Sequence, residues 1–167
     1  MIEECEKALQ EFPGCIVEIG AGYGENTIKF LDLAEKYDRQ VVVIDPFESG
    51  WEGMPPTYRY SSKIFYARVE PLKHRLTVHT LNSLSEEAFL LCKTKLYDIA
   101  FAFIDGLQFM GAVVWDLEMV GNRASVVCVD DMDRKTGESQ VPQAVKYFTT
   151  RYTEKKLTIK DRWAFIR

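Results

Sequence analysis

Three glycines at alternate positions give the clearest chemical signal in the sequence. Gly20, Gly22 and Gly24 follow the apolar run 15–19 and precede a helical pattern that starts at Asn26. A glycine turn between a strand and a helix lets the backbone adopt positive φ angles and approach a ligand closely. The spacing is GxGxG, whereas a dinucleotide site has GxGxxG, whose third glycine lets the helix pack on the strand. The turn therefore predicts a ligand site but argues against a dinucleotide.

Acidic residues surround this turn. Glu18 precedes the first glycine and Glu25 follows the last, where both would repel a pyrophosphate. Asp45 ends the next expected strand, where an acid can accept hydrogen bonds from ribose hydroxyls. A cationic ligand that carries a ribose fits these charges better than a dinucleotide. The alternative is a plain tight turn over 20–24 with Asp45 as a solvated strand end, which the ordered succession of strand, turn, helix, strand and acid disfavours.

Short apolar runs alternate with helical patterns along the chain, which is typical of a parallel α/β sheet. Strands covered on both faces read as nearly continuous apolar runs. Four runs have this character: 15–19, 41–44, 99–104 and 124–129. A weaker strand is expected over 76–80, and the alternating tail, 156–167, predicts a pair of closing strands.

The segments between these strands carry helical periodicity or helix start and stop signals. They predict helices over 26–37, 58–70, 85–92, 110–120 and 142–152. The pattern Ser83-Leu84-Ser85-Glu86 is a capping-box signal for the third of these helices. Two stretches, 47–56 and 130–141, remain as long loops that could carry substrate residues, with Trp51 as a candidate lid residue.

Composition places the chain among ordinary folded proteins. Its 167 residues are 47% hydrophobic and 28% charged, which predicts one domain over 1–167. No apolar run reaches the length of a membrane helix. The net charge of -4 argues against a large contact with a nucleic-acid backbone. The aromatic content leaves room for an apolar interface, so a homodimer stays open.

The chain start and the cysteines bear on location. Glu3, Glu4 and Glu6 occupy a region that would be basic and then apolar in a secretion signal. None of the four cysteines belongs to a CxxC pair or is spaced with a histidine for zinc. We therefore expect reduced thiols in a cytoplasmic protein.

Taken together, these motifs resemble class I S-adenosylmethionine-dependent methyltransferases over nearly the whole chain. Residues 18–24 resemble the first motif of that family, and residues 44–47 resemble its second. Three further segments resemble the small O-methyltransferase branch of the family: 103–106, Trp115-Asp116-Leu117 in the helix that follows, and 129–131. The resemblance implies an α/β fold: a three-layer, Rossmann-like, mostly parallel seven-stranded sheet in the order 3-2-1-4-5-7-6.

The resemblance also implies which residues hold the cofactor, S-adenosyl-L-methionine. The glycine turn would approach its methionine part, and Glu18 would support the turn or the ammonium group. Asp45 would hold the ribose and Phe47 would cover the adenine. The residues implied as cofactor-binding are Glu18, Gly20, Ala21, Gly22, Gly24, Asp45, Pro46, Phe47, Asn82, Ser83, Asp105 and Gly106.

Three aspartates follow two of the expected strands. Asp105 comes after 99–104, and Asp130 and Asp131 come after 124–129, at the edge where open parallel sheets bind ligands. Metal-dependent members such as catechol O-methyltransferase bind magnesium with matching strand ends. Such an ion prefers oxygen ligands and would lower the pKa of a substrate hydroxyl. These three carboxylates are therefore candidate ligands for Mg²⁺, with Asp105 and Asp130 as candidate catalytic residues, while an ordinary charged loop at Asp131 and Asp133 stays open as the alternative.

One residue departs from the family pattern. Gln108 stands where this branch often has histidine, and glutamine cannot act as a general base. A metal or an aspartate must then deprotonate the acceptor, unless the acceptor needs no base. The expected function is O-methyl transfer to a small-molecule acceptor. The alternatives are a noncatalytic methyltransferase-like binding module and, disfavoured by the glycine spacing, an NAD-dependent oxidoreductase.

Overall fold

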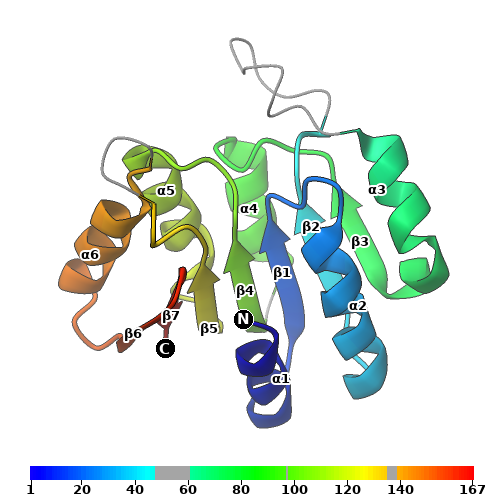
Figure 1. Ribbon diagram of the computed structural model, residues 1–167, viewed down its shortest axis with the longest axis horizontal. Coiled ribbons are helices and arrows are strands. Elements are labelled where there is room, and N and C mark those ends of the chain that lie inside the picture. Colours follow the sequence, from blue (N-terminus) through cyan, green and yellow to red (C-terminus); the bar gives the residue numbers. More distant parts are fainter. Residues whose placement is uncertain (48–60, 97, 135–138) are drawn as a thin grey trace.

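The fold is built on a sheet whose strands are joined by helices that cover both of its faces (Figure 1). The computed structural model describes residues 1–47, 61–96, 98–134 and 139–167. In these ranges the strands are β1 (Cys15–Ile19), β2 (Val41–Ile44), β3 (Leu76–His79), β4 (Ile99–Ile104), β5 (Ala124–Val129), β6 (Leu157–Lys160) and β7 (Trp163–Ile166). Their order is β3-β2-β1-β4-β5-β7-β6, with β7 antiparallel to both of its neighbours and the other pairs parallel. This order confirms the fold expected from the sequence.

The helices divide into two groups, one on each face of the sheet. They are α1 (Ile2–Glu11), α2 (Glu25–Tyr37), α3 (Ser62–Val69) with a 3-10 continuation η3 (Glu70–Arg75), α4 (Glu86–Thr94), α5 (Met110–Val120) and α6 (Val141–Arg151). Successive strand residues point to opposite faces, so Ile16 packs with α1, α2 and α3 while Val17 packs with α4, α5 and α6. Both faces are therefore buried, which explains the nearly continuous apolar runs.

Several boundaries differ from the sequence prediction. The helix expected over 58–70 begins at Ser62, and 58–60 lie outside the described residues. The cap of α4 is Ser85, whose hydroxyl accepts a hydrogen bond from the Ala88 nitrogen at 3.1 Å, so the capping box expected from Ser83 is not formed. The α1 helix was not predicted at all. The expected loop 47–56, with Trp51, also lies outside the described residues apart from its first residue.

The antiparallel return of the chain at β7 matters for the site. Val129 at the end of β5 is paired with Ala164 near the start of β7. Because these strands run in opposite directions, the turn before β7 lies at the carboxyl end of β5. Arg162 is in that turn, and its carbonyl accepts a hydrogen bond from the Met132 nitrogen at 2.9 Å.

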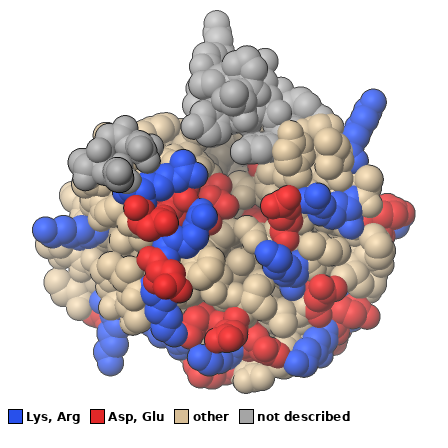
Figure 2. Space-filling model, in the orientation of Figure 1, with Lys and Arg blue, Asp and Glu red and all other residues tan. Residues whose placement is uncertain are grey.

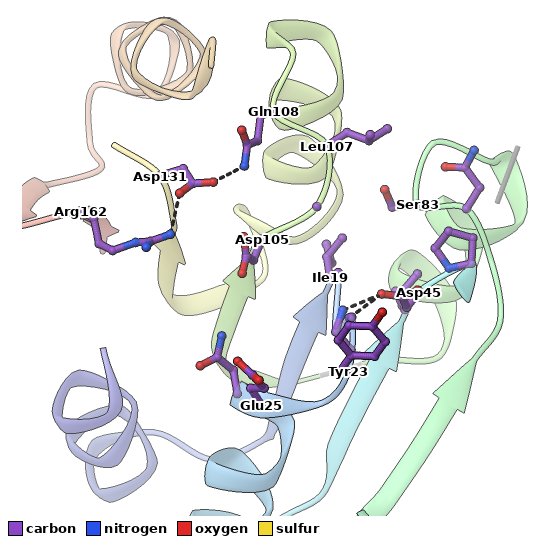
Figure 3. Close-up of a pocket in the computed structure, with 18 of the residues that line it drawn as sticks. Ile19, Tyr23, Glu25, Asp45, Ser83, Asp105, Leu107, Gln108, Asp131 and Arg162 are labelled. Atoms are coloured by element: carbon purple, nitrogen blue, oxygen red, sulfur yellow. Dashed lines mark hydrogen bonds and ion pairs between the residues drawn. The ribbon is translucent and has the colours of Figure 1, made fainter. Parts of the chain in front are cut away.

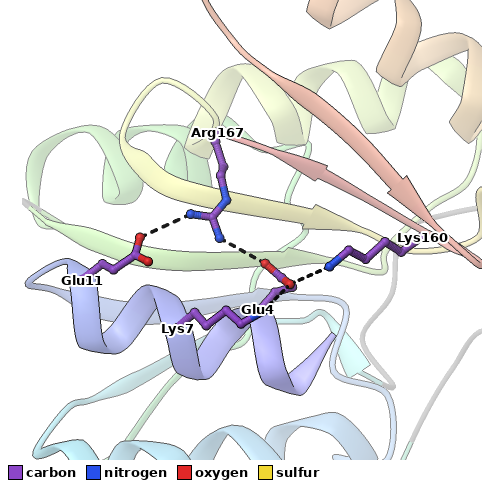
Figure 4. Close-up of polar contacts among 5 residues, drawn as sticks. All are labelled: Glu4, Lys7, Glu11, Lys160 and Arg167. Carbon is purple, nitrogen blue, oxygen red and sulfur yellow. Dashed lines mark hydrogen bonds and ion pairs between the residues drawn. The ribbon is translucent and has the colours of Figure 1, made fainter.

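An ionic cluster ties the C-terminal hairpin to the first helix (Figure 4). The Glu4 carboxylate on α1 lies 2.7 Å from the Lys160 ammonium, 3.0 Å from that of Lys7 and 3.1 Å from the Arg167 guanidinium. Hydrogen bonds from Lys160 and then Lys7 lower the pKa of the nearly buried Glu4 to about 2. These contacts join the two ends of the chain.

The described surface carries charges of both signs (Figure 2), and the cysteines are not joined in disulfides. On the face shown in Figure 2, basic side chains are interspersed with acidic ones rather than gathered together. All four cysteines are free, and burial raises the pKa of Cys15 to about 11 and of Cys92 to about 12. Among the described residues, no helix has the length and apolar character needed to cross a membrane.

Candidate active site

A cavity of about 360 Å³ opens where the strands at the centre of the sheet end (Figure 3). Its lining comes from the turn after β1 and the ends of β2 and β4, together with the loops after β3 and β5 and Arg162. Carboxyl ends of parallel strands are where open α/β sheets bind ligands. The cavity therefore lies where the glycine turn and the strand-end aspartates predicted it.

The glycine turn packs closely against the end of β4. Gly20 has a φ of +83°, and a Cβ atom there would lie 2.3 Å from the carbonyl oxygen of Asp105. A side chain at this position would be strained both by the backbone angle and by this contact. Glycine at position 20 is what lets the turn and the β4 end form one continuous wall.

Asp45 holds the glycine turn from the end of β2. Its Oδ2 accepts hydrogen bonds from the backbone nitrogens of Ala21 at 2.7 Å and Gly22 at 3.0 Å, and its Oδ1 accepts one from Phe47 at 2.6 Å. The residue also lines the cavity. A carboxylate oxygen can accept more than one hydrogen bond, which is what lets Oδ2 hold two successive residues of the turn.

Glu18 lies beneath the turn rather than in the cavity wall. Its side chain is buried, Oε2 accepts a hydrogen bond from Thr27, and Oε1 has no partner among the described residues. Burial is the main reason that the pKa of Glu18 rises to about 8, and the nearby Asp105 and Asp45 add to it. Of its two expected roles, this position favours support of the turn over contact with a ligand.

Most of the expected cofactor-binding residues meet in the cavity wall. Those that line it are Gly20, Ala21, Gly22, Asp45, Pro46, Asn82, Ser83, Asp105 and Gly106. Glu18, Gly24 and Phe47 lie outside that lining. Phe47 is buried with its ring centroid 4.9 Å from that of Phe65, so it is a core residue and does not face the cavity as expected for an adenine cover.

The loop after β3 is held in place by α5. Asn82 Oδ1 accepts a hydrogen bond from the Leu84 nitrogen at 3.0 Å, and the Ser83 carbonyl accepts one from the Trp115 indole at 2.9 Å. The Trp115 ring packs in turn against Phe89 at 5.2 Å between centroids. This loop therefore presents Asn82 and Ser83 to the cavity from a fixed backbone.

Asp105 is the carboxylate at the opposite side of the cavity from Asp45. It is half-buried at the end of β4 and lines the cavity. Burial raises the pKa of Asp105 to about 7, helped by the negative charges of Asp130 and Asp131 and opposed by Arg162. A carboxyl group with such a pKa can exchange a proton near neutral pH.

Asp130 and Asp131 are paired with arginines. The Arg162 Nε lies 2.5 Å from Asp130 Oδ1, and its Nη2 lies 2.5 Å from Asp131 Oδ1. Arg134 Nε is a further 3.0 Å contact to Asp131, and the Gln108 amide donates to the other oxygen of Asp131. Figure 3 shows Arg162 and Gln108 pointing toward Asp131, beside Asp105.

This pairing changes the expectation for a metal. Of the residues that the structure describes, no three Asp, Glu, His or Cys side chains form a group that could hold a metal ion. The residues do not fit magnesium, because Asp130 and Asp131 already have cationic partners. The structure thus gives no support to a Mg²⁺ site on Asp105, Asp130 and Asp131, and Asp130 also lies outside the main cavity lining.

The cavity includes residues that the sequence analysis did not assign. Tyr23, Glu25 and Asn26 line it beside the glycine turn, and their closeness to the motif was a usable signal. Arg134 and Arg162 line it as well. Nothing in the local sequence marks Arg162, since only the pairing of β7 with β5 brings it to the site.

Comparison with known proteins identifies the class of fold. No protein-family model matches the sequence, and no curated protein matches it either. Three solved structures each align with 99% of the chain: the O-methyltransferase NovP (18% identity, TM-score 0.75, 78% of that chain), a TDP-rhamnose 3'-O-methyltransferase of calicheamicin biosynthesis (18%, 0.70, 76%), and an O-methyltransferase from Bacillus cereus in complex with SAH (15%, 0.65, 78%). The chain therefore has the Rossmann-like fold of class I methyltransferases.

Proposed function

We propose that this protein is an S-adenosyl-L-methionine-dependent methyltransferase that methylates an oxygen atom of a small-molecule acceptor. The observation that carries the proposal is the presence of two carboxylates on opposite sides of one cavity. Asp45 holds the glycine turn on one side, and Asp105, with a pKa raised to about 7, lies on the other. The fold shared with O-methyltransferases, one of them solved with SAH, supports it.

The described residues fit this cofactor. Asp45 would accept hydrogen bonds from the ribose hydroxyls, and the backbone of the glycine turn would lie against the methionine part. Asn82 and Ser83 would border the adenine. When bound, the cofactor supplies a methyl group activated by a sulfonium ion. Carboxylates around the cavity complement that positive charge, whereas they would repel the pyrophosphate of NAD.

Asp105 is the proposed general base. With a pKa of about 7 it is substantially ionised at neutral pH and can take the proton of an acceptor hydroxyl. Gln108 cannot do so, and its amide is engaged with Asp131. Asp130 was expected to be catalytic, but its carboxylate receives Arg162 and the Asp131 nitrogen, so we assign it a positioning role. The rest of the catalysis is positioning and charge complementarity.

Other features belong to the same proposal. We place the protein in the cytoplasm as one domain over 1–167. The acceptor assay should be run on the monomer and on a homodimer, if both form in solution. Magnesium has no role in the proposed reaction, because Asp130 and Asp131, the two carboxylates expected to bind it together with Asp105, are already paired with Arg162.

Calorimetric titration with S-adenosylmethionine, S-adenosylhomocysteine and NAD tests the proposal. We expect both sulfur ligands to bind and NAD not to bind. A panel of hydroxylated small molecules would then be screened for release of S-adenosylhomocysteine. Binding of the sulfur ligands without turnover on any acceptor would favour the noncatalytic binding module. Binding of NAD alone would favour the oxidoreductase.

A further inference from the structure

The carboxyl end of β5 carries its own cation. Arg162 precedes β7 and is placed there by the antiparallel pairing of Val129 with Ala164. Its backbone is fixed as well, because its carbonyl accepts a hydrogen bond from the Met132 nitrogen at 2.9 Å. Both the strand pairing and this bond act on the main chain, so the guanidinium is directed to the β5 end by the fold itself.

The guanidinium divides its donors between two carboxylates. Nε contacts Asp130 and Nη2 contacts Asp131, each at 2.5 Å, so one side chain bridges both acids. The acids are almost fully buried, at 7% and 2% exposure, while Arg134 adds a second positive charge at Asp131. Two carboxylates and two guanidiniums thus balance within this cluster.

The same contacts engage three carboxylate oxygen atoms that a divalent cation at the β5 end would use: Oδ1 of Asp130 and both oxygens of Asp131. Asp130 Oδ1 receives Arg162 and the Asp131 nitrogen. Asp131 Oδ1 receives Arg162 and Arg134, and Asp131 Oδ2 receives Gln108. Magnesium requires near-octahedral oxygen ligands. A divalent ion here would also be repelled by the guanidiniums.

We propose that Arg162 is a built-in counter-ion that takes the charge-balancing place of a divalent cation at the β5 end, so that this site excludes Mg²⁺ and Mn²⁺. The proposal that this site excludes metal ions does not depend on which reaction the protein catalyses. Its consequence for catalysis rests on the proposed methyl transfer: without a metal to acidify the acceptor hydroxyl, Asp105 must accept the proton. Arg162 then also acts on Asp105, since its charge opposes the rise in the Asp105 pKa.

Titration of the protein with Mn²⁺, followed by the electron paramagnetic resonance of the free ion, tests the exclusion. We expect no saturable binding to the wild type up to about 1 mM, the weak end of protein sites for hard cations. Arg162→Ala should gain saturable binding at least about tenfold tighter than the wild type, because a repelling charge is removed and carboxylate oxygens are released. Arg162→Lys keeps the charge and should not gain it.

Arg75→Ala is the matched control. Arg75 also bridges two carboxylates, Glu35 at 2.9 Å and Asp38 at 2.5 Å, but both are solvent-exposed on the surface. Its removal should not create a cation site. Equal gains in Arg75→Ala and Arg162→Ala would overturn the proposal, as would no gain in a folded Arg162→Ala.

A comparison of the wild type with Asp131→Asn decides the question if Arg162→Ala does not fold. Saturable Mn²⁺ binding to the wild type that is lost in Asp131→Asn would overturn the proposal. Titration of the same preparations with S-adenosylhomocysteine keeps the two proposals apart. Failure to bind that ligand would count against the methyltransferase function and leave the metal result unaffected.

Discussion

The carboxylate of Asp45 lies 2.7 Å from the backbone nitrogen of Ala21, so the end of β2 holds the turn that follows β1. A second bond, from the Gly22 nitrogen at 3.0 Å, fixes the next residue of the turn. These bonds join two motifs that are separate in the sequence into one wall of the cavity. The residue expected to hold the ribose therefore also shapes the surface against which the rest of the cofactor would lie.

Asp45→Asn should weaken cofactor binding. The substitution removes the negative charge and replaces one acceptor oxygen by a donor group, so contacts to Ala21 or Gly22 and to a ribose hydroxyl are lost. We expect the affinity for S-adenosylhomocysteine to fall by about tenfold to a hundredfold, measured by calorimetry. Asp32→Asn, at an exposed position on α2, is the control and should bind like the wild type. An unchanged affinity of Asp45→Asn would remove Asp45 from the binding site.

Asp105→Asn should abolish most of the turnover while the cofactor still binds. The amide cannot accept the acceptor's proton, so we expect kcat to fall about a hundredfold or more. In the wild type, kcat should rise with pH and reach half its maximum near the Asp105 pKa of about 7, because only the ionised form is a base. The residual rate of the variant should lack this rise.

Asp133→Asn provides the matched control for that experiment. Asp133 is an exposed acid close in sequence to the site. Its substitution should leave both the rate and the pH profile unchanged. If Asp105→Asn kept the wild-type pH profile, another group would have to be the base.

Asp116→Asn should stabilise the protein at alkaline pH. Asp116 on α5 is fully buried, and neither carboxylate oxygen has a hydrogen-bond partner among the described residues. Burial raises the pKa of Asp116 from 3.8 to about 7; the nearby Ser83 hydroxyl opposes this without meeting hydrogen-bond geometry. Asp116 therefore stays protonated to a higher pH in the folded state than in the unfolded state. Stability is lost as the pH rises from about 4 through 7.

The variant cannot ionise at this position and should escape that loss. We expect the free energy of unfolding of Asp116→Asn, relative to that of the wild type, to be about 1–3 kcal/mol larger at pH 8 than at pH 5. Urea unfolding at the two pH values measures the difference. Glu18 is also a buried acid, but it is common to both proteins and cancels. An equal difference at both pH values would show that Asp116 does not titrate in this range.

Glu4→Gln should destabilise the fold near neutral pH. The carboxylate is held by Lys160, Lys7 and Arg167, and its pKa is lowered to about 2. A lowered pKa contributes stability that is present above the ordinary value of 4.5 and is lost as the pH falls through about 2. Because the cationic partners are partly exposed, we expect a loss of about 1–2 kcal/mol at pH 7 by urea unfolding.

The control for this variant is Glu3→Gln, an exposed acid in the same first turn of α1. It should change stability by no more than about 0.5 kcal/mol. The destabilisation of Glu4→Gln should shrink as the pH is lowered from 4.5 toward 2. A loss that stayed constant over this range would point to packing rather than to the ionic cluster.

Much of the fold was predictable because it depends on local composition. Strands buried on both faces must be nearly continuous apolar runs, and those runs marked the central strands correctly. The turn at Gly20 was recognisable because only glycine fits its positive φ and its contact with the Asp105 carbonyl. The α1 helix was missed, although Cys5, Ala8 and Leu9 have helical spacing and are buried against the sheet.

The amino-acid sequence by itself determined the succession of strands and helices from the first strand onward, the glycine turn, and the edge of the sheet at which Asp45, Asp105 and Asp131 gather. It could do so because side-chain periodicity and turn geometry are properties of neighbouring residues. Only the tertiary structure decided what balances the charge of the two aspartates that follow β5. Arg162 lies far along the chain from Asp130 and Asp131, and the antiparallel pairing of β7 with β5 brings its guanidinium to the place where the sequence had suggested a metal. Charge balance in a buried cluster depends on distances in space, and no local pattern records them.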